Sequence, residues 1–421
     1  MKSKKIFHHL LKTTLITGAL LGSIYSHAAP ILAPLTTKNG QIIDKNGQLV
    51  VLQGVSWFGF NTGNHLLHGL WTADFDTMLK KIKSLGFNAV RIPFQFDFIA
   101  DPNIQPSGIN TSCNGQPHSC NLDVPQDSAL HAFQWVVQQF TNNGIYVLLD
   151  DHYEDDTYTN DQAAWLNGWK KVAGLFKDNP LVGYDLYNEP DSHQITWDGS
   201  GSNAPAWDAS SLAAMDALYS IDSSKLFLIE GTGQGLLESN WGDGFAMDSD
   251  AAKQASTPKN FFTQLMSKPY LNQVVLSPHV YGPDGTNGNG ADESDQTRAF
   301  TVWSRLFGYL NNNFLSGNNK QSGFCIDDKT CHLFPIAVGE FGGKFDVNDP
   351  WYKKDLATNI NLVNFLNQLT SHQANWFYWD WNPNSGNTGG ILKNDWKTID
   401  CNKVNFLEEN LALKPSNGIC S

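Results

Sequence analysis

The strongest constraint on the fold is a repeated alternation of short apolar runs with longer amphipathic stretches. Eight runs are rich in β-branched and aromatic residues, as strands are, and stretches with helical periodicity lie between them. The runs cover residues 50–60, 88–94, 145–153, 181–189, 225–231, 273–282, 334–341 and 375–381. Eight strands alternating with helices are typical of an α/β chain folded as a (β/α)8 barrel, the TIM barrel.

The amphipathic stretches predict the outer helices of such a barrel. They are expected at about 72–85, 126–142, 162–176, 205–221, 299–313 and 352–371, with shorter ones near 261–267 and 405–411. An open, doubly wound sheet is the structural alternative, but no Gly-x-Gly-x-x-Gly follows any of the runs. A small N-terminal hairpin is expected where Asn39-Gly40 and Asn46-Gly47 flank a short apolar segment. Extended loops rich in Gly, Asn, Asp and Ser would shape a cleft.

Residues 1–29 are typical of a cleaved secretion signal. Lysines precede an apolar stretch that is interrupted by Lys12 and is too short to span a bilayer, and small residues end the segment at Ala28 and Ala29. A natively structured N-terminal helix is the alternative. The remaining residues, 30–421, are expected to form one catalytic barrel domain, because neither a repeat nor a Pro/Thr/Ser-rich linker divides them.

Export would explain the cysteines, because disulfides persist in oxidising compartments. Six cysteines permit 15 pairings. We favour local pairs, since each brackets a loop or the C-terminal tail, where a crosslink restrains a flexible segment. Metal binding is disfavoured because no Cys-x-x-Cys or His-x-x-x-His spacing accompanies them. The expected pairs are Cys113 with Cys120, Cys325 with Cys331, and Cys401 with Cys420.

The charge balance excludes some partners. The net charge is −13, and it becomes −17 without residues 1–29, which contain four lysines and no acidic residue. This acidity argues against nucleic acid or an anionic membrane as a partner. The chain also contains 14 Trp. Most are expected in the core, although sugar rings can stack on flat aromatic faces in a cleft.

Two glutamates lie where predicted strands run into loops: Glu189 in Tyr-Asn-Glu-Pro, and Glu340 in Gly-Glu-Phe-Gly. Such a pair can cut a glycosidic bond, because one carboxyl protonates the leaving oxygen while the other, ionised, attacks the sugar carbon. The alternative is two unrelated carboxylates, one capping a helix and one in a buried ion pair. Their shared context favours the catalytic interpretation, because the carboxyl ends of barrel strands converge on one face.

Other polar and aromatic side chains are expected at the same face. They are Arg91, His152, Asn188, His279, Tyr281 and Trp379. The set offers a fixed cation, neutral hydrogen-bonding groups and a ring platform, without a phosphate cradle or a metal cluster, which suits a sugar and predicts no cofactor. The alternatives are a buried ion pair for Arg91, a satisfied core position for either histidine, and simple packing for Tyr281.

Several motifs resemble those of glycoside hydrolase family 5. They are Arg91-Ile-Pro, Leu186-Tyr-Asn-Glu-Pro, Pro278-His-Val-Tyr, Gly339-Glu-Phe-Gly and Trp379-Asp-Trp-Asn-Pro. Further segments, among them His68-Gly-Leu-Trp and the stretch 385–396, are similar to a subgroup of bacterial endo-β-1,4-glucanases. The resemblance runs from about residue 50 to residue 400, nearly the whole chain after the signal.

The resemblance implies a division of roles at the centre of the site. Glu189 would be the acid/base and Glu340 the nucleophile. Asn188 would bind the 2-hydroxyl of the attacked sugar. Arg91 and Tyr281 would hold the nucleophile, and a cation and a phenol beside a carboxyl do favour its ionised form.

The resemblance also implies roles around that centre. His152 and His279 would bind sugar hydroxyls or orient the acid/base, and Trp379 would floor the subsite of the attacked sugar. Trp71 and Trp241 are weaker candidates for more distant subsites, with core or surface packing as the alternative.

We therefore expect a secreted, retaining endo-β-1,4-glucanase that acts on cellulose-like β-glucans. A family resemblance defines mechanism better than substrate, so mixed-linkage glucan, xyloglucan or mannan are alternative substrates. A sugar-binding barrel without catalysis is the alternative from another class, and the presence of both glutamates counts against it. We expect a monomer that needs no cofactor and binds neither nucleic acid nor membrane.

Overall fold

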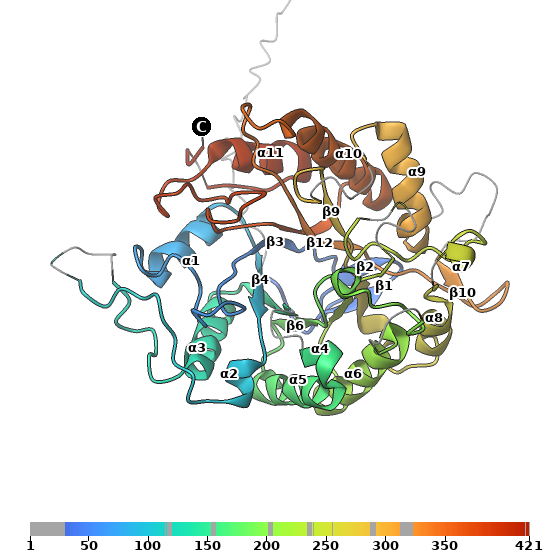
Figure 1. Ribbon diagram of the computed structural model, residues 1–421, viewed down its shortest axis with the longest axis horizontal. Coiled ribbons are helices and arrows are strands. Elements are labelled where there is room, and N and C mark those ends of the chain that lie inside the picture. Colours follow the sequence, from blue (N-terminus) through green and yellow to red (C-terminus); the bar gives the residue numbers. More distant parts are fainter. Residues whose placement is uncertain are drawn as a thin grey trace, which may run out of the picture.

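The computed structural model describes residues 30–113, 115, 120–152, 157–200, 205–233, 238, 240–254, 256–286, 292–311, 323–416 and 418–420. The predicted secretion signal, residues 1–29, lies outside these residues. Strands form a central ring, and helices surround it (Figure 1). The fold is the expected (β/α)8 barrel.

The barrel wall is a parallel sheet in the order β8-β7-β6-β5-β4-β3-β13-β12-β9. Strands β8 and β9 come from one predicted run, which is interrupted at Ser277-Pro278 because proline has no N–H for the sheet ladder. The ring closes where Leu276 of β8 bridges Ile336, just before β12, while β9 pairs with β12. The wall strands are β3 (Gln53–Ser56), β4 (Ala89–Phe94), β5 (Tyr146–Asp151), β6 (Val182–Asp185), β7 (Phe227–Ile229), β8 (Val274–Leu276), β9 (His279–Tyr281), β12 (Ala337–Gly342) and β13 (Asn375–Tyr378).

Side chains alternate between the barrel interior and the helix layer along each strand, as the pleat requires. In β4, Ala89 joins the small interior cluster, whereas Val90 packs in the large core under the helices. In β5, Leu148 joins the interior cluster, and Asp150 lies two positions further along the same strand. The interior is therefore apolar at its N-terminal end and charged at its C-terminal end, which places the chemistry at one face.

The helices begin and end where local sequence signals place them. Five of them start after a side chain that accepts a backbone N–H, such as Asp74 before α1 and Ser128 before α3. The α-helices are α1 (Phe75–Ser84), α2 (Asp97–Ala100), α3 (Ala129–Asn142), α4 (Thr157–Asn160), α5 (Gln162–Phe176), α6 (Trp207–Ile221), α7 (Ala251–Gln254), α8 (Lys259–Leu265), α9 (Gln296–Leu306), α10 (Tyr352–Thr370) and α11 (Cys401–Leu411). Short 3-10 turns are η1 (Pro190–His193), η2 (Leu271–Gln273) and η3 (Gly308–Leu310). The helix expected over 299–313 ends earlier, at Leu306, and α2, α4 and α7 were not predicted.

Two small hairpins complete the fold. The predicted N-terminal hairpin consists of β1 (Thr36–Lys38) and β2 (Gln41–Ile43), turning at Asn39-Gly40. Its Ile42 joins the interior cluster and closes the apolar end of the barrel. The second hairpin, β10 (Phe324–Cys325) with β11 (Cys331–His332), was not predicted, because two-residue strands leave no periodic signal.

All three predicted disulfides are present: Cys113–Cys120, Cys325–Cys331 and Cys401–Cys420. The second closes the β10–β11 hairpin, and the third ties the start of α11 to the C-terminal tail. Within the described residues, no helix combines the length and the apolar character needed to cross a membrane.

Candidate active site

Arg91 is the centre of a charged network at the C-terminal end of the barrel. Its side chain is fully buried on β4, and its Nε lies 3.0 Å from Oδ2 of Asp185 on β6. Its Nη2 lies 3.0 Å from Oδ1 of Asp150 and donates to Oδ1 of Asn188 at 2.9 Å, while Nη1 contacts Glu340. The guanidinium therefore links side chains from β4, β5, β6 and β12 at the C-terminal end of the barrel, where Arg91 was expected.

Glu340 lies on β12 and is almost completely buried, with 3% of its surface exposed. Its Oε1 accepts from Arg91, and its Oε2 accepts from the Tyr281 hydroxyl at 2.6 Å. Burial, reinforced by the charge of Glu340, raises the pKa of Tyr281 well above its usual range, so this phenol stays protonated and donates. Two donors from different strands thus fix both oxygens of one carboxylate.

Glu189 follows β6 and faces a different neighbour. Its Oε1 lies 3.0 Å from Nδ1 of His279, and one of its carboxylate oxygens lies within 4.8 Å of one from Glu340. Its backbone adopts φ 45° and ψ 65°, in the left-handed region that non-glycine residues seldom occupy. The backbone N–H donates to Oε2 of Glu230 at 2.9 Å. The two glutamates therefore share one site, but their hydrogen-bond partners differ. Glu189 meets His279, whereas Glu340 accepts from Arg91 and Tyr281.

His279 is fully buried and stands between three glutamates. Its Nε2 lies 3.1 Å from Oε1 of Glu230, and its Nδ1 lies 3.8 Å from Oε2 of Glu340, in addition to its contact with Glu189. Burial lowers its pKa, but Glu230 and Glu340 outweigh that effect and raise it well above the usual range. His279 is consequently a donor toward the site.

His152 and Trp379 form a flat wall beside the glutamates. His152 directs Nδ1 at Oδ2 of Asp150, 2.7 Å away, and its ring is nearly parallel to that of Trp379, with 5.7 Å between ring centroids. Phe58 lies at the same centroid distance from Trp379, also nearly parallel. The Trp379 Nε1–H donates to the Ser385 hydroxyl at 3.2 Å, which fixes the orientation of the indole. Trp379 is partly exposed, as a ring platform must be.

The two outer tryptophans lie in different settings. Trp71 is 38% exposed, and its ring meets those of His68 and Trp396 at centroid distances of 5.3 and 4.9 Å. Because His68 in turn packs against Phe58, Trp71 continues the aromatic surface that begins at Trp379. Trp241 is partly exposed, and its carbonyl accepts the N–H of His279 at 2.9 Å. Its main chain is therefore part of the barrel rim.

Three carboxyls that carry the network were absent from the predicted set: Asp150, Asp185 and Glu230. All are fully buried, and burial raises the pKa of Asp185 to about 7 and that of Glu230 well above its usual range. The signal that would have revealed them is the two-residue alternation of β5, β6 and β7, which turns acids toward the barrel interior. These inward acids matter for the site because their charges and that of Arg91 shift one another's pKa.

Two of the carboxyl clusters that could hold a metal ion are contacted by a cationic side chain of the protein. Asp185, Glu230 and His279 lie close enough together to bind a metal ion, but Arg91 contacts both acids of that group. A second cluster outside the site, Asp284, Asp349 and Asp355, includes the ammonium of Lys344 at 2.9 Å from Asp284 and 3.2 Å from Asp349. A cationic side chain of the chain itself therefore contacts two carboxyls in each cluster.

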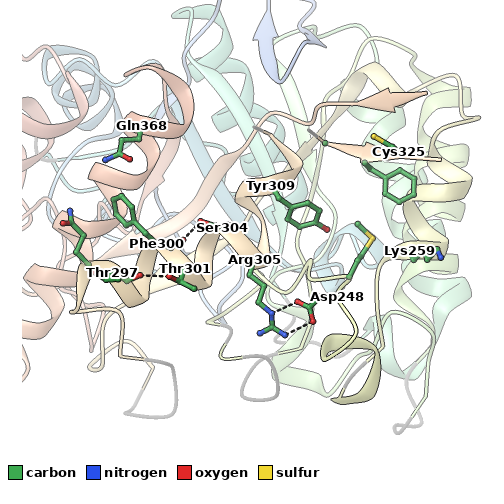
Figure 2. Close-up of a pocket in the computed structure, with 14 residues that line it drawn as sticks. Asp248, Lys259, Thr297, Phe300, Thr301, Ser304, Arg305, Tyr309, Cys325 and Gln368 are labelled. Atoms are coloured by element: carbon green, nitrogen blue, oxygen red, sulfur yellow. Dashed lines mark hydrogen bonds and ion pairs between the residues drawn. The ribbon is translucent and has the colours of Figure 1, made fainter. Parts of the chain in front are cut away.

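A separate pocket of about 840 Å³ lies among α8, α9 and β10 (Figure 2). Arg305 of α9 reaches across it to Asp248, with Nε 2.5 Å from Oδ2. None of the residues that line it belongs to the predicted site. The described residues that line it include one carboxyl, that of Asp248, so it offers no facing pair for glycosidic chemistry.

Comparison with known proteins indicates one enzyme family. Residues 43–385 match the family described as Cellulase (glycosyl hydrolase family 5). The chain is 32% identical to the major extracellular endoglucanase of Xanthomonas campestris pv. campestris, over 94% of this chain and 74% of that protein. It is 28% identical to an endoglucanase of Paenibacillus polymyxa, over 91% and 88% of the two chains.

Solved structures agree with the sequence matches. The catalytic domain of the Xanthomonas campestris endoglucanase superposes with a TM-score of 0.69 at 30% identity, covering 90% of this chain and 99% of that one. An endocellulase from Pyrococcus horikoshii in complex with cellotetraose superposes with a TM-score of 0.70 at 30% identity, covering 91% and 99%.

Proposed function

Because the chain belongs to the cellulase family of glycosyl hydrolases, family 5, we propose that it is a secreted, retaining endo-β-1,4-glucanase that hydrolyses internal bonds of cellulose-like β-glucans. One observation carries the mechanism: carboxylate oxygens of Glu189 and Glu340 lie within 4.8 Å of each other. Retaining glycosidases hold their two carboxyl groups about 5–5.5 Å apart, whereas inverting enzymes leave about 6.5–9.5 Å for a water. The short spacing supports direct attack by a carboxylate.

In the first step, Glu340 is the nucleophile. Its oxygen forms a bond to the anomeric carbon while the glycosidic C–O bond breaks, and the proton of Glu189 passes to the leaving oxygen. The different neighbours of the two acids support these roles, since Glu340 accepts from Arg91 and Tyr281, whereas Glu189 contacts neither in the described structure.

In the second step, Glu189 is the base. Water attacks the anomeric carbon and gives a proton to Glu189, and the bond between that carbon and Glu340 breaks, which restores both acids and retains the configuration. Asn188, held by Arg91, binds the 2-hydroxyl, and Trp379 floors the subsite of the attacked sugar. His152 and His279 bind hydroxyls or orient the acid/base, while Trp71 and Trp241 serve more distant subsites.

The substrate proposal rests on relatives. The Xanthomonas campestris and Paenibacillus polymyxa proteins are endoglucanases, and the Pyrococcus horikoshii structure contains cellotetraose. Similarity to a β-mannanase, at 17% identity, concerns the fold alone. The aromatic surface from Trp379 to Trp71 suits a chain of equatorially linked glucose units, whose apolar faces are flat.

Reducing-sugar release from purified cellulose, mixed-linkage β-glucan, xyloglucan, xylan and mannan tests the proposal. We expect release from cellulose and β-glucan, with a rapid fall in polymer length that marks internal cleavage. Preference for mannan or xyloglucan would change the substrate while keeping the mechanism. Binding of these polymers without turnover would replace the enzyme by a sugar-binding barrel.

Secretion and domain organisation are part of the proposal. The extracellular relative and the three disulfides support export of the chain. We expect N-terminal sequencing of the exported protein to start near residue 29 or 30, and light scattering to give the mass of a single domain and a monomer. Retention of residues 1–29 in the exported protein would contradict the signal.

A further inference from the structure

Glu230 is one of the buried acids that the mechanism above does not use. It directly follows β7 and is fully buried, with its carbonyl fixed by the Trp207 indole, whose Nε1–H donates at 2.9 Å. Both of its carboxyl oxygens act on Glu189, one by direct contact and the other through His279. Oε2 accepts the backbone N–H of Glu189 at 2.9 Å, and Oε1 lies 3.1 Å from Nε2 of His279, whose Nδ1 meets the Glu189 side chain at 3.0 Å.

The main chain of Glu189 needs such a restraint. Its φ of 45° lies in the left-handed region, where the Cβ of a non-glycine residue is crowded. A backbone held there persists only when surrounding contacts specify it. Downstream, the Glu189 carbonyl accepts the N–H and the hydroxyl of Ser192, both at 2.9 Å. Upstream, the contact with Glu230 fixes the N–H, so this carboxyl controls the direction in which the Glu189 side chain leaves the strand.

The space around Glu230 and His279 is shaped for this arrangement. A Cβ atom at Gly242 would lie 2.3 Å from Oε2 of Glu230, and one at Gly339 would lie 2.6 Å from Nε2 of His279. Any side chain at either position would displace the carboxyl or the imidazole. Gly242 lies in the loop after β7, and Gly339 lies on β12, the strand that carries Glu340. Two separate segments thus leave room for the contact between Glu230 and His279.

Resting on the proposed function, we propose that Glu230 is a positioning residue for the proton donor: one carboxyl holds both the main chain of Glu189 and the imidazole that meets its side chain. Glu230 does not touch substrate. It acts through Glu189, and it keeps the acid aimed at the leaving oxygen. General acid assistance is worth about 10²–10⁴-fold in rate, so misdirecting the acid affects those bonds whose leaving group needs a proton.

Glu230→Gln tests this role with little change in volume. Glutamine has one acceptor oxygen and an amide that only donates, so it cannot accept from both Glu189 and His279. We expect kcat/KM for cellotetraose to fall about 100-fold, and kcat/KM for 2,4-dinitrophenyl β-cellobioside, whose leaving group departs without a proton, to fall less than about threefold. An equal loss on both substrates, or no loss on cellotetraose, would overturn the proposal.

Glu293→Gln is the matched control, because Glu293 is another buried acid whose carboxyl oxygens have no hydrogen-bond partner in the described structure. It should leave both substrates unaffected. If Glu230→Gln fails to fold, as judged by circular dichroism, Glu230→Asp keeps the charge but shortens the reach, and the same selective loss is expected. Wild-type protein that cleaves neither substrate would instead refute the proposed function.

Discussion

At the scale of single residues, Glu189 and Glu340 differ because their neighbours differ. Glu340 is held on both oxygens by Arg91 and Tyr281, whereas Glu189 meets His279. A carboxylate with fixed donors suits attack on carbon, and a carboxyl beside a histidine suits proton transfer. The proposed roles therefore follow from contacts, and substitution can separate them.

Azide distinguishes the two glutamates. Glu340→Ala should abolish turnover and be partly rescued by azide with inverted product, because the anion enters the space of the lost nucleophile. Glu189→Ala should be rescued with retained configuration, because azide then attacks the intermediate on Glu340. Proton NMR of the glycosyl azides measures the outcome, and exchanged configurations would reverse the two roles.

Trp379 should contribute more to the transition state than to substrate binding. Its ring lies nearly parallel to those of Phe58 and His152, and we expect its apolar face to keep water from the developing cation. Trp379→Ala should lower kcat/KM by an amount that corresponds to about 2–4 kcal/mol in activation free energy, the upper range for a buried aromatic contact. Trp71→Ala is the comparison, and it should cost less and affect long glucans more than short ones. A folded Trp379→Ala enzyme with nearly normal activity would show that this ring is only structural.

At the scale of elements, α11 supports the aromatic platform from behind. Its Lys403 is buried and donates to the Thr388 carbonyl at 2.7 Å, and the hydroxyl of Thr388 lies 2.7 Å from that of Ser385. Ser385 in turn accepts from the Trp379 indole. The disulfide at the start of α11 thus restrains an element that reaches the site.

Removal of disulfides should destabilise the protein in order of loop length. The Cys401–Cys420 bridge spans 19 residues and the Cys325–Cys331 bridge spans 6. From loop-closure entropy we expect losses of about 3 and about 2 kcal/mol in the free energy of unfolding when each pair is replaced by serine. Denaturant titration measures both. Peptide mapping of the unreduced protein should recover all three local pairs, and free thiols or long-range pairs would contradict the arrangement.

At the scale of the whole molecule, buried acids make stability depend on pH. Glu293 is 1% exposed, and neither of its carboxyl oxygens has a hydrogen-bond partner in the described structure. Burial raises its pKa from 4.5 to about 8. The folded chain therefore keeps a proton that the unfolded chain releases, so the stability linked to this group is complete below pH 4.5 and is lost as pH rises through 8.

Glu293→Gln should remove this pH dependence. The free energy of unfolding of the variant, relative to wild type, should increase between pH 5 and pH 8 by up to about 1.4 kcal/mol per unit of pH. Denaturant titration of both proteins at the two pH values measures the difference. Parallel changes in the two proteins would show that Glu293 ionises at an ordinary pH in the folded state.

Much of the barrel could be predicted from the sequence, because its strands and helices are encoded locally. The alternation of periods two and 3.6 identified the barrel, and residue types at the strand ends identified the chemistry before any contact was known. Helix α5, from Gln162 to Phe176, was predicted with its observed bounds. The four-residue helices α2, α4 and α7 and the hairpin of β10 and β11 were not predicted, since they are shorter than a detectable period.

Only the tertiary structure decided which charged groups meet. Arg91 and Glu340 are separated by 249 positions in the chain, and Glu189 and Glu230 by 41, so closing the barrel creates their contacts. The left-handed backbone of Glu189, whose N–H is held by Glu230, depends on the same closure. Periodicity along the chain specifies which face a side chain occupies, but the distance between two strands' side chains is set by packing of the whole ring. The sequence alone therefore determined the fold and the candidate catalytic residues, and the closed barrel determined which side chains contact them.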